Sequence, residues 1–271
     1  MPSARTLTTG IRAFVGDTHA SDAVAASGAR PAIVLVHGIG TSHRYFSRLH
    51  RELESNGTVY SLDLPGFGGT LKPSFSPTVR EMALLLARSL DELALRDVVL
   101  VGHSMGAQWV VELALLRPDL ASHVVLIGPV SDSKHRSLLA QSRALAVDIL
   151  GEPPLTNAVV FLDYLRCGPA YFLAQSTPML SYPIDERVAS LTQPLLVLRG
   201  GNDPIASEDW CRRLVARAPI GCLVTVPHNR HVVQFTAPKA VAGEIRAFVN
   251  GRLAPPTERR VSRHGVPMTR P

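Results

Sequence analysis

Continuous apolar runs, rather than alternating ones, indicate the strands of this 271-residue chain. Residues 32–37 read AIVLVH and residues 98–102 read VVLVG, and a glycine ends each run. Strands that are apolar on both faces are typical of a parallel sheet covered by helices on both sides. Runs of the same kind predict further strands at 58–64, 123–128, 195–200 and 222–226.

Apolar residues at helical spacing occupy the segments between these strands. In residues 78–95, one stripe holds Val79, Met82, Leu86 and Leu90, which predicts an amphipathic helix. The alternation of strands and helices predicts an α/β fold, with a mostly parallel twisted sheet and helices on both faces. We expect an added antiparallel strand within residues 8–17 and further helices near 45–53, 107–116, 207–217 and 238–249.

One long segment between the strands at 123–128 and 195–200 interrupts this alternation. It spans about 65 residues, with many prolines and with helical patterns at 137–150 and 155–166. A connection of this length is usually functional, so we interpret it as a helical lid above the sheet. The sequence therefore divides into a core at 1–130 and 191–251, a lid at 131–190 and a tail at 252–271.

Composition and charge narrow the class of protein. Hydrophobic residues make up 46% of the chain and charged residues 18%, which is enough for a sizeable core. The net charge is +6, but the tail at 252–271 alone carries five arginines against one glutamate. The rest of the surface is therefore ordinary, and we expect no nucleic-acid partner. Because the tail is rich in Pro and Arg and has no hydrophobic periodicity, we predict that it is disordered.

The sequence shows no sign of a membrane or secretory location. No apolar stretch is long enough to span a bilayer, and the first residues hold no apolar block of signal-peptide length. The three cysteines form no CxxC motif or metal-type spacing, which favours reduced, buried thiols in a cytoplasmic protein. The oligomeric state cannot be read from the sequence.

A serine stands between two glycines where the strand at 98–102 gives way to a helix. Gly102, Ser104 and Gly106 form a Gly-x-Ser-x-Gly motif, which chance alone produces in roughly one chain in ten of this length. Its position is more specific, because glycines relieve clashes at a sharp strand-to-helix turn that exposes a nucleophilic serine. The turn also places the hydroxyl at the carboxyl edge of the sheet, where open α/β folds bind ligands.

A serine hydroxyl needs a base to become a strong nucleophile, and the base needs an acid to orient it. Asp203 follows the strand at 195–200, and His228 and His231 follow the strand at 222–226. Carboxyl ends of parallel strands meet at one edge of a sheet, so these loops are expected on the same side as Ser104.

These motifs, taken together, resemble those of serine hydrolases of the α/β-hydrolase fold, over roughly residues 10–250. The resemblance implies that Ser104 is the nucleophile, Asp203 the acid and His231 the base of a catalytic triad. It also implies that the backbone amides of Ile39 and Met105 form the oxyanion hole, and that the lid lies between the sixth and seventh strands. The matching segments are HGIG at 37–40, DLPGFGGT at 63–70, GHSMG at 102–106, GNDP at 201–204 and HVVQFTAPKAV at 231–241.

Two site assignments have alternatives. Asp132 follows the strand at 123–128, where some members of the fold place the acid. His228 is the other candidate base, although the family usually places the base just before an apolar stretch, which favours His231. His228 also stands where such proteins often have Gly. We expect no catalytic role for four other residues near the motifs: His37 and His103, which we interpret as structural, and His43 and Arg44, which we expect to be exposed.

The predicted activity is hydrolysis of a carboxylic ester through an acyl-enzyme. Aromatic and aliphatic residues are frequent in the lid, which favours a small to medium, largely apolar substrate. The same triad also supports carbon–carbon bond hydrolysis and cofactor-free perhydrolysis, and a non-catalytic ligand-binding role is the remaining alternative. We expect no cofactor. We also expect no metal, since His228-x-x-His231 lacks a third ligand.

Overall fold

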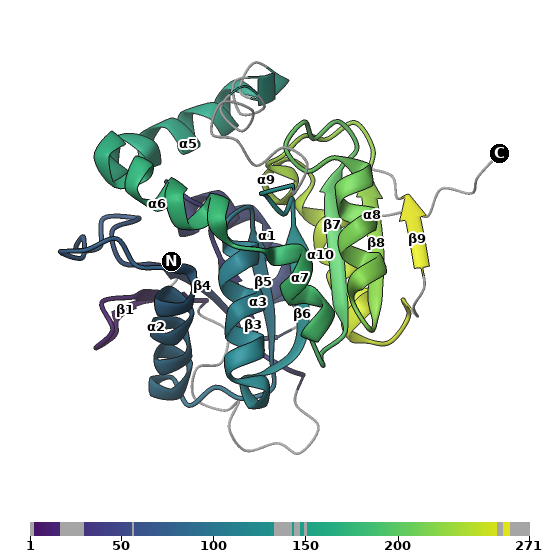
Figure 1. Cartoon of the computed structure of the whole chain (residues 1–271), viewed down its shortest axis with the longest axis horizontal. Helices are drawn as coiled ribbons and strands as arrows, with labels where there is room; N and C mark the ends of the chain where they lie inside the picture. The colour runs from purple at the N-terminus through teal and green to yellow at the C-terminus, as the bar shows by residue number, and fades with distance from the viewer. Residues whose placement is uncertain are drawn as a thin grey trace.

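A mixed sheet of nine strands forms the centre of the described structure (Figure 1), in the order β1-β2-β4-β3-β5-β6-β7-β8-β9. The computed structural model describes residues 3–16, 30–55, 57–132, 143, 147–148, 151–253 and 257–260. The strands are β1 (Ser3–Thr6), β2 (Arg12–Val15), β3 (Ile33–Val36), β4 (Val59–Asp63), β5 (Val98–His103), β6 (Ala121–Ile127), β7 (Leu195–Gly200), β8 (Gly221–Val226) and β9 (Thr257–Arg260).

The strands from β4 to β9 in this order pair in parallel, whereas β1 and β2 form an antiparallel addition beside β4. Because the parallel strands share one direction, the loops that follow β3, β5, β7 and β8 emerge at the same edge of the sheet. The predicted fold class is confirmed, including the antiparallel strand expected within residues 8–17.

Helices cover both faces of the sheet, as the apolar runs predicted. Neighbouring residues of one strand pack into different cores, with Val34 and Val36 in one core and Leu35 in the other. The first core is covered by α2 (Val79–Glu92), α3 (Gly106–Leu116) and α8 (Glu208–Arg217), and the second by α1 (Ser47–Glu54), α9 (Val233–Thr236) and α10 (Pro238–Val249). Two short 3-10 turns, η1 (His43–Phe46) and η2 (Pro118–Leu120), precede α1 and β6.

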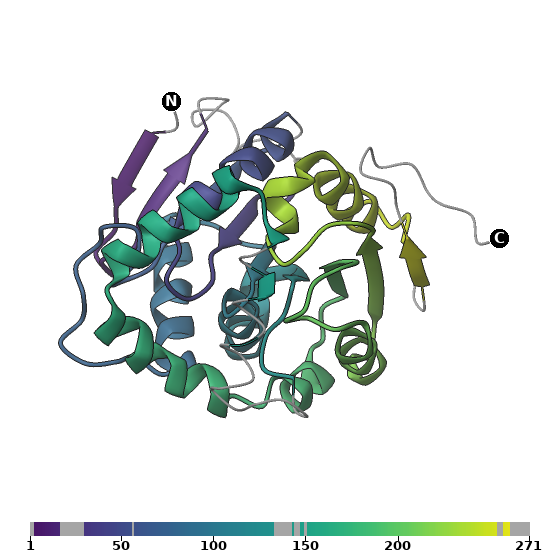
Figure 2. The ribbon, with the colours of Figure 1, turned by 90° about the horizontal axis from the view of Figure 1, so that it is seen from above.

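A helical segment connects β6 to β7. It contains α5 (Pro154–Cys167), α6 (Pro169–Ser181), α7 (Ile184–Arg187) and η3 (Val188–Ser190). Helices α5 and α6 lie at the end of the sheet to which the parallel strands point (Figure 1), and from above they cross the half nearer β1 and β2 (Figure 2). The helix expected at 155–166 corresponds to α5, whereas the one expected at 137–150 lies mostly outside the described residues.

The C-terminal segment departs from the expectation of a disordered tail at 252–271. Residues Thr257–Arg260 form β9, which pairs in parallel with β8 at the edge of the sheet. Strand pairing uses backbone groups, and the edge of β8 offers unpaired N–H and C=O groups to any extended segment. A tail without hydrophobic periodicity can therefore still add a strand, which is why the composition gave the wrong expectation for these four residues.

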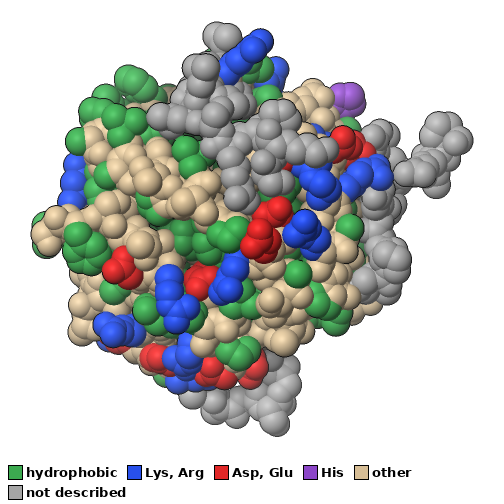
Figure 3. Space-filling view, in the orientation of Figure 1, with side chains coloured by type: hydrophobic (Ala, Val, Ile, Leu, Met, Phe, Trp, Pro, Cys, Tyr) green, Lys and Arg blue, Asp and Glu red, His purple; other side chains and the backbone are tan. Residues whose placement is uncertain are grey.

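Surface and membrane properties can be stated for the described part of the chain. Within it, no helix combines the length and apolar character that crossing a bilayer requires. The face in Figure 3 carries interspersed positive and negative side chains over α3, α7 and α8. The three cysteines are buried thiols.

Candidate active site

Ser104 occupies a strained turn between β5 and α3. Its φ of 55° lies in the left-handed region, which costs a non-glycine residue of order 1–3 kcal/mol. A Cβ atom at Gly102 would lie 2.3 Å from the carbonyl oxygen of Gly106, and one at Gly106 would lie 2.4 Å from that of Val36. Glycine is therefore required on both sides of the serine, because the helix begins against the preceding strands. This is the turn that the Gly-x-Ser-x-Gly motif predicts.

The Ser104 side chain faces a pocket at the carboxyl edge of the sheet. The residue is 9% exposed, and the pocket is also lined by His231 and Gly38. A Cβ at Gly38 would lie 2.8 Å from that of Ser104, so the loop after β3 passes directly against the serine. Among the described residues, Ser104 Oγ has no hydrogen-bond partner. Catalytic hydrogen bonds are often long without substrate and tighten when it binds.

Asp203 and His231 are joined by a hydrogen bond. His231 Nδ1 lies 2.9 Å from Asp203 Oδ2, and both side chains are buried. The other carboxylate oxygen of Asp203 accepts the backbone N–H groups of Ile205 and Ala206, at 2.8 and 2.9 Å. Burial alone would raise the pKa of Asp203, but His231 and the two amides outweigh burial and lower it. The carboxylate is thus ionised and held in one orientation toward the imidazole.

The buried carboxylate of Asp203 also changes the pKa of His231. Burial disfavours the charged imidazole, but the Asp203 carboxylate, with smaller contributions from Asp148 and Glu152, more than compensates and raises the pKa of His231 to about 9. An imidazolium that forms at this position is therefore stabilised by its acid partner. This is the electrostatic property that a general base needs when it takes a proton from a serine.

The two rival residues, Asp132 and His228, differ from Asp203 and His231 in their contacts and backbone geometry. Asp132 Oδ1 lies 2.5 Å from a guanidinium nitrogen of Arg213 on α8, so that Asp132 is paired with an arginine. His228 has a φ of 61° and lines a separate hollow on the surface. A positive φ is a conformation that glycine adopts more readily than histidine. Asp203 and His231 are thus the acid and imidazole that the structure brings together.

Two backbone amides are available next to Ser104. Ile39 follows Gly38 in the loop after β3 and lines the pocket, and Met105 directly precedes the first residue of α3. Neither amide has a hydrogen-bond acceptor among the described residues. The N-terminus of α3 adds a partial positive charge at Met105. The two N–H groups can therefore receive a negative oxygen.

Beneath the turn, His103 links the loops that carry these groups. The Gly38 N–H donates to the Tyr45 hydroxyl at 2.6 Å, and that hydroxyl is 2.8 Å from His103 Nδ1. His103 Nε2 lies 3.0 Å from the carbonyl oxygen of His231, so Nε2 carries the proton and Nδ1 accepts one from Tyr45. Burial and the neighbouring His231 lower the pKa of His103 to about 3, which keeps it neutral. His103 is structural, as the sequence analysis expected.

The pocket above Ser104 is lined largely by apolar side chains, with two acids among them. Asp148 Oδ1 accepts the backbone N–H of His231 at 3.2 Å, and Glu152 Oε1 accepts that of Val232 at 3.1 Å. Burial raises the pKa of Asp148, and it raises that of Glu152 to about 7. The apolar lining comes from Ile39, Val130 and Ile205 on the sheet side and from Val160, Tyr164, Phe172 and Met179 on α5 and α6.

Comparison with known proteins adds the family to this geometry. Residues 33–244 match the model of the alpha/beta hydrolase family. The chain belongs to that family. Uncharacterized hydrolase YugF of Bacillus subtilis is 38% identical over 246 residues, covering 81% of this chain and 90% of that protein. The (E)-2-((N-methylformamido)methylene)succinate hydrolase of Acinetobacter baylyi is 23% identical over 235 residues, covering 80% and 89%.

Solved structures show the same fold. An esterase from Thermogutta terrifontis superposes with a TM-score of 0.73 at 21% identity, covering 92% of this chain and 98% of that one. An E-2-(acetamidomethylene)succinate hydrolase gives 0.75 at 20% identity, covering 92% and 100%. At such identities the likeness establishes the fold alone. The family and the relatives together support hydrolysis as the reaction class.

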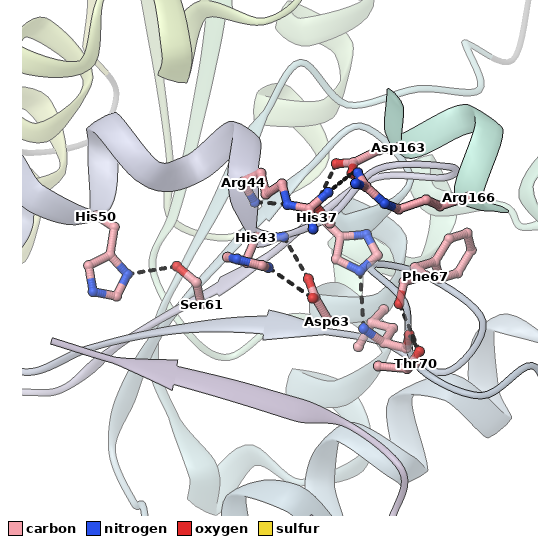
Figure 4. A network of polar contacts seen from close by, with 12 residues as sticks. His37, His43, Arg44, His50, Ser61, Asp63, Phe67, Thr70, Asp163 and Arg166 are labelled. Atoms are coloured by element: carbon pink, nitrogen blue, oxygen red, sulfur yellow. Dashed lines mark hydrogen bonds and ion pairs between the residues drawn. The ribbon is translucent and has the colours of Figure 1, made fainter. Parts of the chain in front are cut away.

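In this alpha/beta hydrolase, a network of polar contacts holds the loop after β3 in place (Figure 4). His37 Nδ1 donates to the carbonyl oxygen of Gly38 at 2.7 Å, and its Nε2 accepts the N–H of Leu64 at 3.1 Å. Asp63 accepts the backbone and ring N–H groups of His43 at 2.7 and 2.8 Å. His37 is structural, as expected. His43 is less exposed than expected, because Asp63 and the stacked ring of Phe14 hold it.

The same loop is tied to the helical segment through Asp163 on α5 (Figure 4). The Asp163 carboxylate, which is 2% exposed, accepts the Ser42 hydroxyl at 2.5 Å and the Arg44 guanidinium at 3.1 Å. Arg166, one turn further along α5, approaches it at 3.5 Å. Arg44 therefore neither faces the pocket nor is wholly free in solvent. It connects α5 to the loop that carries Ile39.

Asp148 and Glu152 are the functional candidates that the sequence analysis missed. Asp148 lies near the end of the helical pattern expected at 137–150, Glu152 lies between that pattern and α5, and none of the matching motif segments includes either residue. Their role depends on where the chain folds back to meet the backbone of His231 and Val232, which is a tertiary contact. The only available sign was two acids in a segment expected to cover an apolar pocket.

Proposed function

We propose that this alpha/beta hydrolase cleaves carboxylic esters through an acyl-enzyme formed on Ser104. The observation that carries the proposal is the Asp203–His231 hydrogen bond, at 2.9 Å, beside a serine held at positive φ in the same pocket. A nucleophile, an oriented base and two available amides are the groups that acyl transfer requires.

In the proposed cycle, Ser104 Oγ attacks the ester carbonyl carbon while its proton moves to His231 Nε2. Asp203 holds Nδ1–H and stabilises the imidazolium. The carbonyl oxygen becomes negative and accepts the amides of Ile39 and Met105. The C–O bond then breaks, His231 gives its proton to the leaving alcohol, and water cleaves the acyl-enzyme by the same steps. Loss of one oxyanion donor is expected to reduce the rate by on the order of 10²–10³.

The helices α5 and α6 act as the lid in this proposal. They supply Val160, Tyr164, Phe172 and Met179 to the pocket that Ser104 lines. Because most of the lining is apolar, the pocket suits an acyl or alcohol group of small to medium size that is largely hydrocarbon. The lid would also exclude water from the acyl-enzyme until the alcohol has left.

The test combines covalent labelling with turnover. We expect a fluorophosphonate probe to label Ser104, and p-nitrophenyl esters of graded chain length to be hydrolysed with an optimum. Ser104→Ala should abolish both signals, since it removes the attacking oxygen. Ser122→Ala, at a half-buried serine on β6 outside the pocket, is the matched control and should leave both unchanged.

Other outcomes separate the alternatives. Undiminished ester turnover by Ser104→Ala would refute the mechanism. Labelling of Ser104 with no ester turnover, but cleavage of a 1,3-diketone, would assign carbon–carbon bond hydrolysis to the same groups. Thermal stabilisation by esters without labelling or turnover would indicate a binding protein.

A further inference from the structure

We infer that the pocket selects its substrate by charge: Asp148 and Glu152 favour esters that carry a cationic nitrogen and disfavour esters that carry a carboxylate. The inference deepens the proposed function and rests on it, since it concerns the pocket that Ser104 lines. It names a substrate class that the apolar lining alone does not suggest.

The first support is that each of the two acids has a carboxylate oxygen without a hydrogen-bond donor among the described residues. One oxygen of each carboxylate accepts a hydrogen bond from a backbone N–H of the loop that carries His231. The second oxygen, Oδ2 of Asp148 and Oε2 of Glu152, has no donor among the described residues. The two residues are only 2% and 8% exposed, and both line the pocket. Both residues line the pocket, so a carboxylate oxygen without a donor from the described residues is available to a donor or a cation on the ligand.

The second support is that Ser104 Oγ, the reacting atom of the proposed mechanism, is itself unpartnered and lines the same pocket. A substrate whose carbonyl carbon meets Ser104 therefore shares one cavity with the two acids. This distinguishes the pair from an acidic cluster on the surface, where water would satisfy each oxygen.

The third support is the lack of a competing cation inside the pocket. Among the described residues that line it, none is Lys or Arg, and His231 is already paired with Asp203. Arg230 attracts both carboxylates from outside the pocket, since it lines the separate surface hollow and donates to the carbonyl oxygen of Val147 at 3.1 Å. Within the described lining, a cationic group on a substrate would therefore meet two carboxylates that form no salt bridge with a lysine or arginine of the pocket.

The aromatic lining fits the same ligand. Tyr164 and Phe172 pack against each other with their ring centroids 5.3 Å apart, and both line the pocket. Aromatic faces attract ammonium groups, and a quaternary ammonium is bulky and partly apolar as well as positive. Burial raises the pKa of both acids, and a bound cation favours their ionised forms.

The experiment compares esters that differ in charge and little else. On the acyl side, the p-nitrophenyl esters of 4-(trimethylammonio)butanoic acid, 5,5-dimethylhexanoic acid and glutaric acid offer a cation, its neutral isostere and an anion. On the alcohol side, acetylcholine and 3,3-dimethylbutyl acetate form the matching pair. In at least one series, we expect kcat/KM to be about tenfold or more higher for the cation than for its isostere, and lower for the anion than for the neutral ester.

Variants locate the effect. Glu152→Gln and Asp148→Asn remove charge but keep an oxygen that can accept the backbone N–H, so each should lower the cation-to-neutral ratio by about fivefold or more. Using the ratio cancels any general loss of activity. Glu186→Gln, an exposed position on α7 outside the pocket, is the control for loss of one negative charge and should leave the ratio unchanged.

The outcomes are distinguishable. Hydrolysis of the neutral esters without preference for the cation on either side overturns the charge inference and leaves the esterase proposal intact. A preference for the cation that persists in both Glu152→Gln and Asp148→Asn would also overturn it, because residues other than these two acids would then recognise the substrate charge. Absence of both turnover and fluorophosphonate labelling would instead refute the proposed function. The wild-type ratio tests the inference even if a variant does not fold.

Discussion

The pocket is built from two regions that are stabilised in different ways. On the sheet side, every residue of β5, β7 and β8 is buried, and the candidate triad stands on the loops that follow these strands. On the lid side, only Thr156, Asp163 and Cys167 of α5 are buried. The same helix leaves Phe161, Leu162 and Leu165 more than half exposed.

The lid reaches the first core through Cys167, Tyr171 and Met179, and polar contacts attach it as well. Asp163 meets Ser42 and Arg44, the Tyr171 hydroxyl donates to the carbonyl oxygen of Pro65 at 2.9 Å, and Gln175 donates to the Ser76 hydroxyl at 2.7 Å. Regions with few buried apolar contacts open at lower free energy than a packed core. The comparison teaches that the reacting groups are fixed by the core, while the groups that meet the substrate belong to a region that can adjust.

The largest expected effect concerns the acid on the sheet side. Asp203→Asn should reduce kcat by about 10⁴, since the amide favours the wrong imidazole tautomer and no longer stabilises the imidazolium. Asp132→Asn is the matched control at a buried aspartate on the neighbouring loop. It removes the partner of Arg213, so we expect it to lower stability and change kcat by less than about tenfold. A larger kcat loss in Asp132→Asn than in Asp203→Asn would reverse the acid assignment.

The second prediction is the pH profile of the same pair. His231 must be neutral to accept the serine proton, and Asp203 raises its pKa to about 9 despite burial. We therefore expect kcat/KM to rise with pH up to about 9. Removing the carboxylate in Asp203→Asn should move this acid limb to lower pH, whereas Asp132→Asn should leave it in place. An acid limb that stayed at the same pH in Asp203→Asn would show that another group controls it.

The sign of the stability change follows from the same values. A pKa raised from 6.5 to about 9 means that protonated His231 stabilises the fold most below pH 6.5. This contribution falls as the pH rises through the window from 6.5 to about 9. The lowered pKa of Asp203 acts in the opposite direction, since its contribution is present above its ordinary value of 3.8 and is lost on further acidification. Between pH 6.5 and about 9, we therefore expect the His231 contribution to stability to fall while kcat/KM rises.

The two regions also differ in how far the sequence predicts them. Gly102 is required by the nearby carbonyl oxygen of Gly106, and Gly106 by that of Val36 on a neighbouring strand, but both glycines belong to one short motif around Ser104. Asp203 follows a strand whose apolar run is unmistakable. Local rules of this kind can be read from residues alone. Asp148 and Glu152 cannot, because their place in the pocket depends on backbone N–H groups more than 75 residues away. The same holds for β9, whose pairing depends on a free edge of β8 and not on its own side-chain pattern.

The smallest predicted effect tests the attachment of the lid. Asp163→Asn keeps one oxygen for Ser42 but removes the charge that meets Arg44, whose side chain is 40% exposed. Since a partly exposed pair contributes about 1 kcal/mol or less, we expect KM to rise by no more than about fivefold, with kcat reduced less. Proteolysis within α5 should become faster, while the thermal unfolding of the core should change little. Asp119→Asn, which removes an exposed partner of Arg117 far from the lid, is the matched control and should change none of these. A kcat loss as large as that of Asp203→Asn would show that α5 takes part in fixing the reacting groups, and the contrast between the two regions would then be wrong.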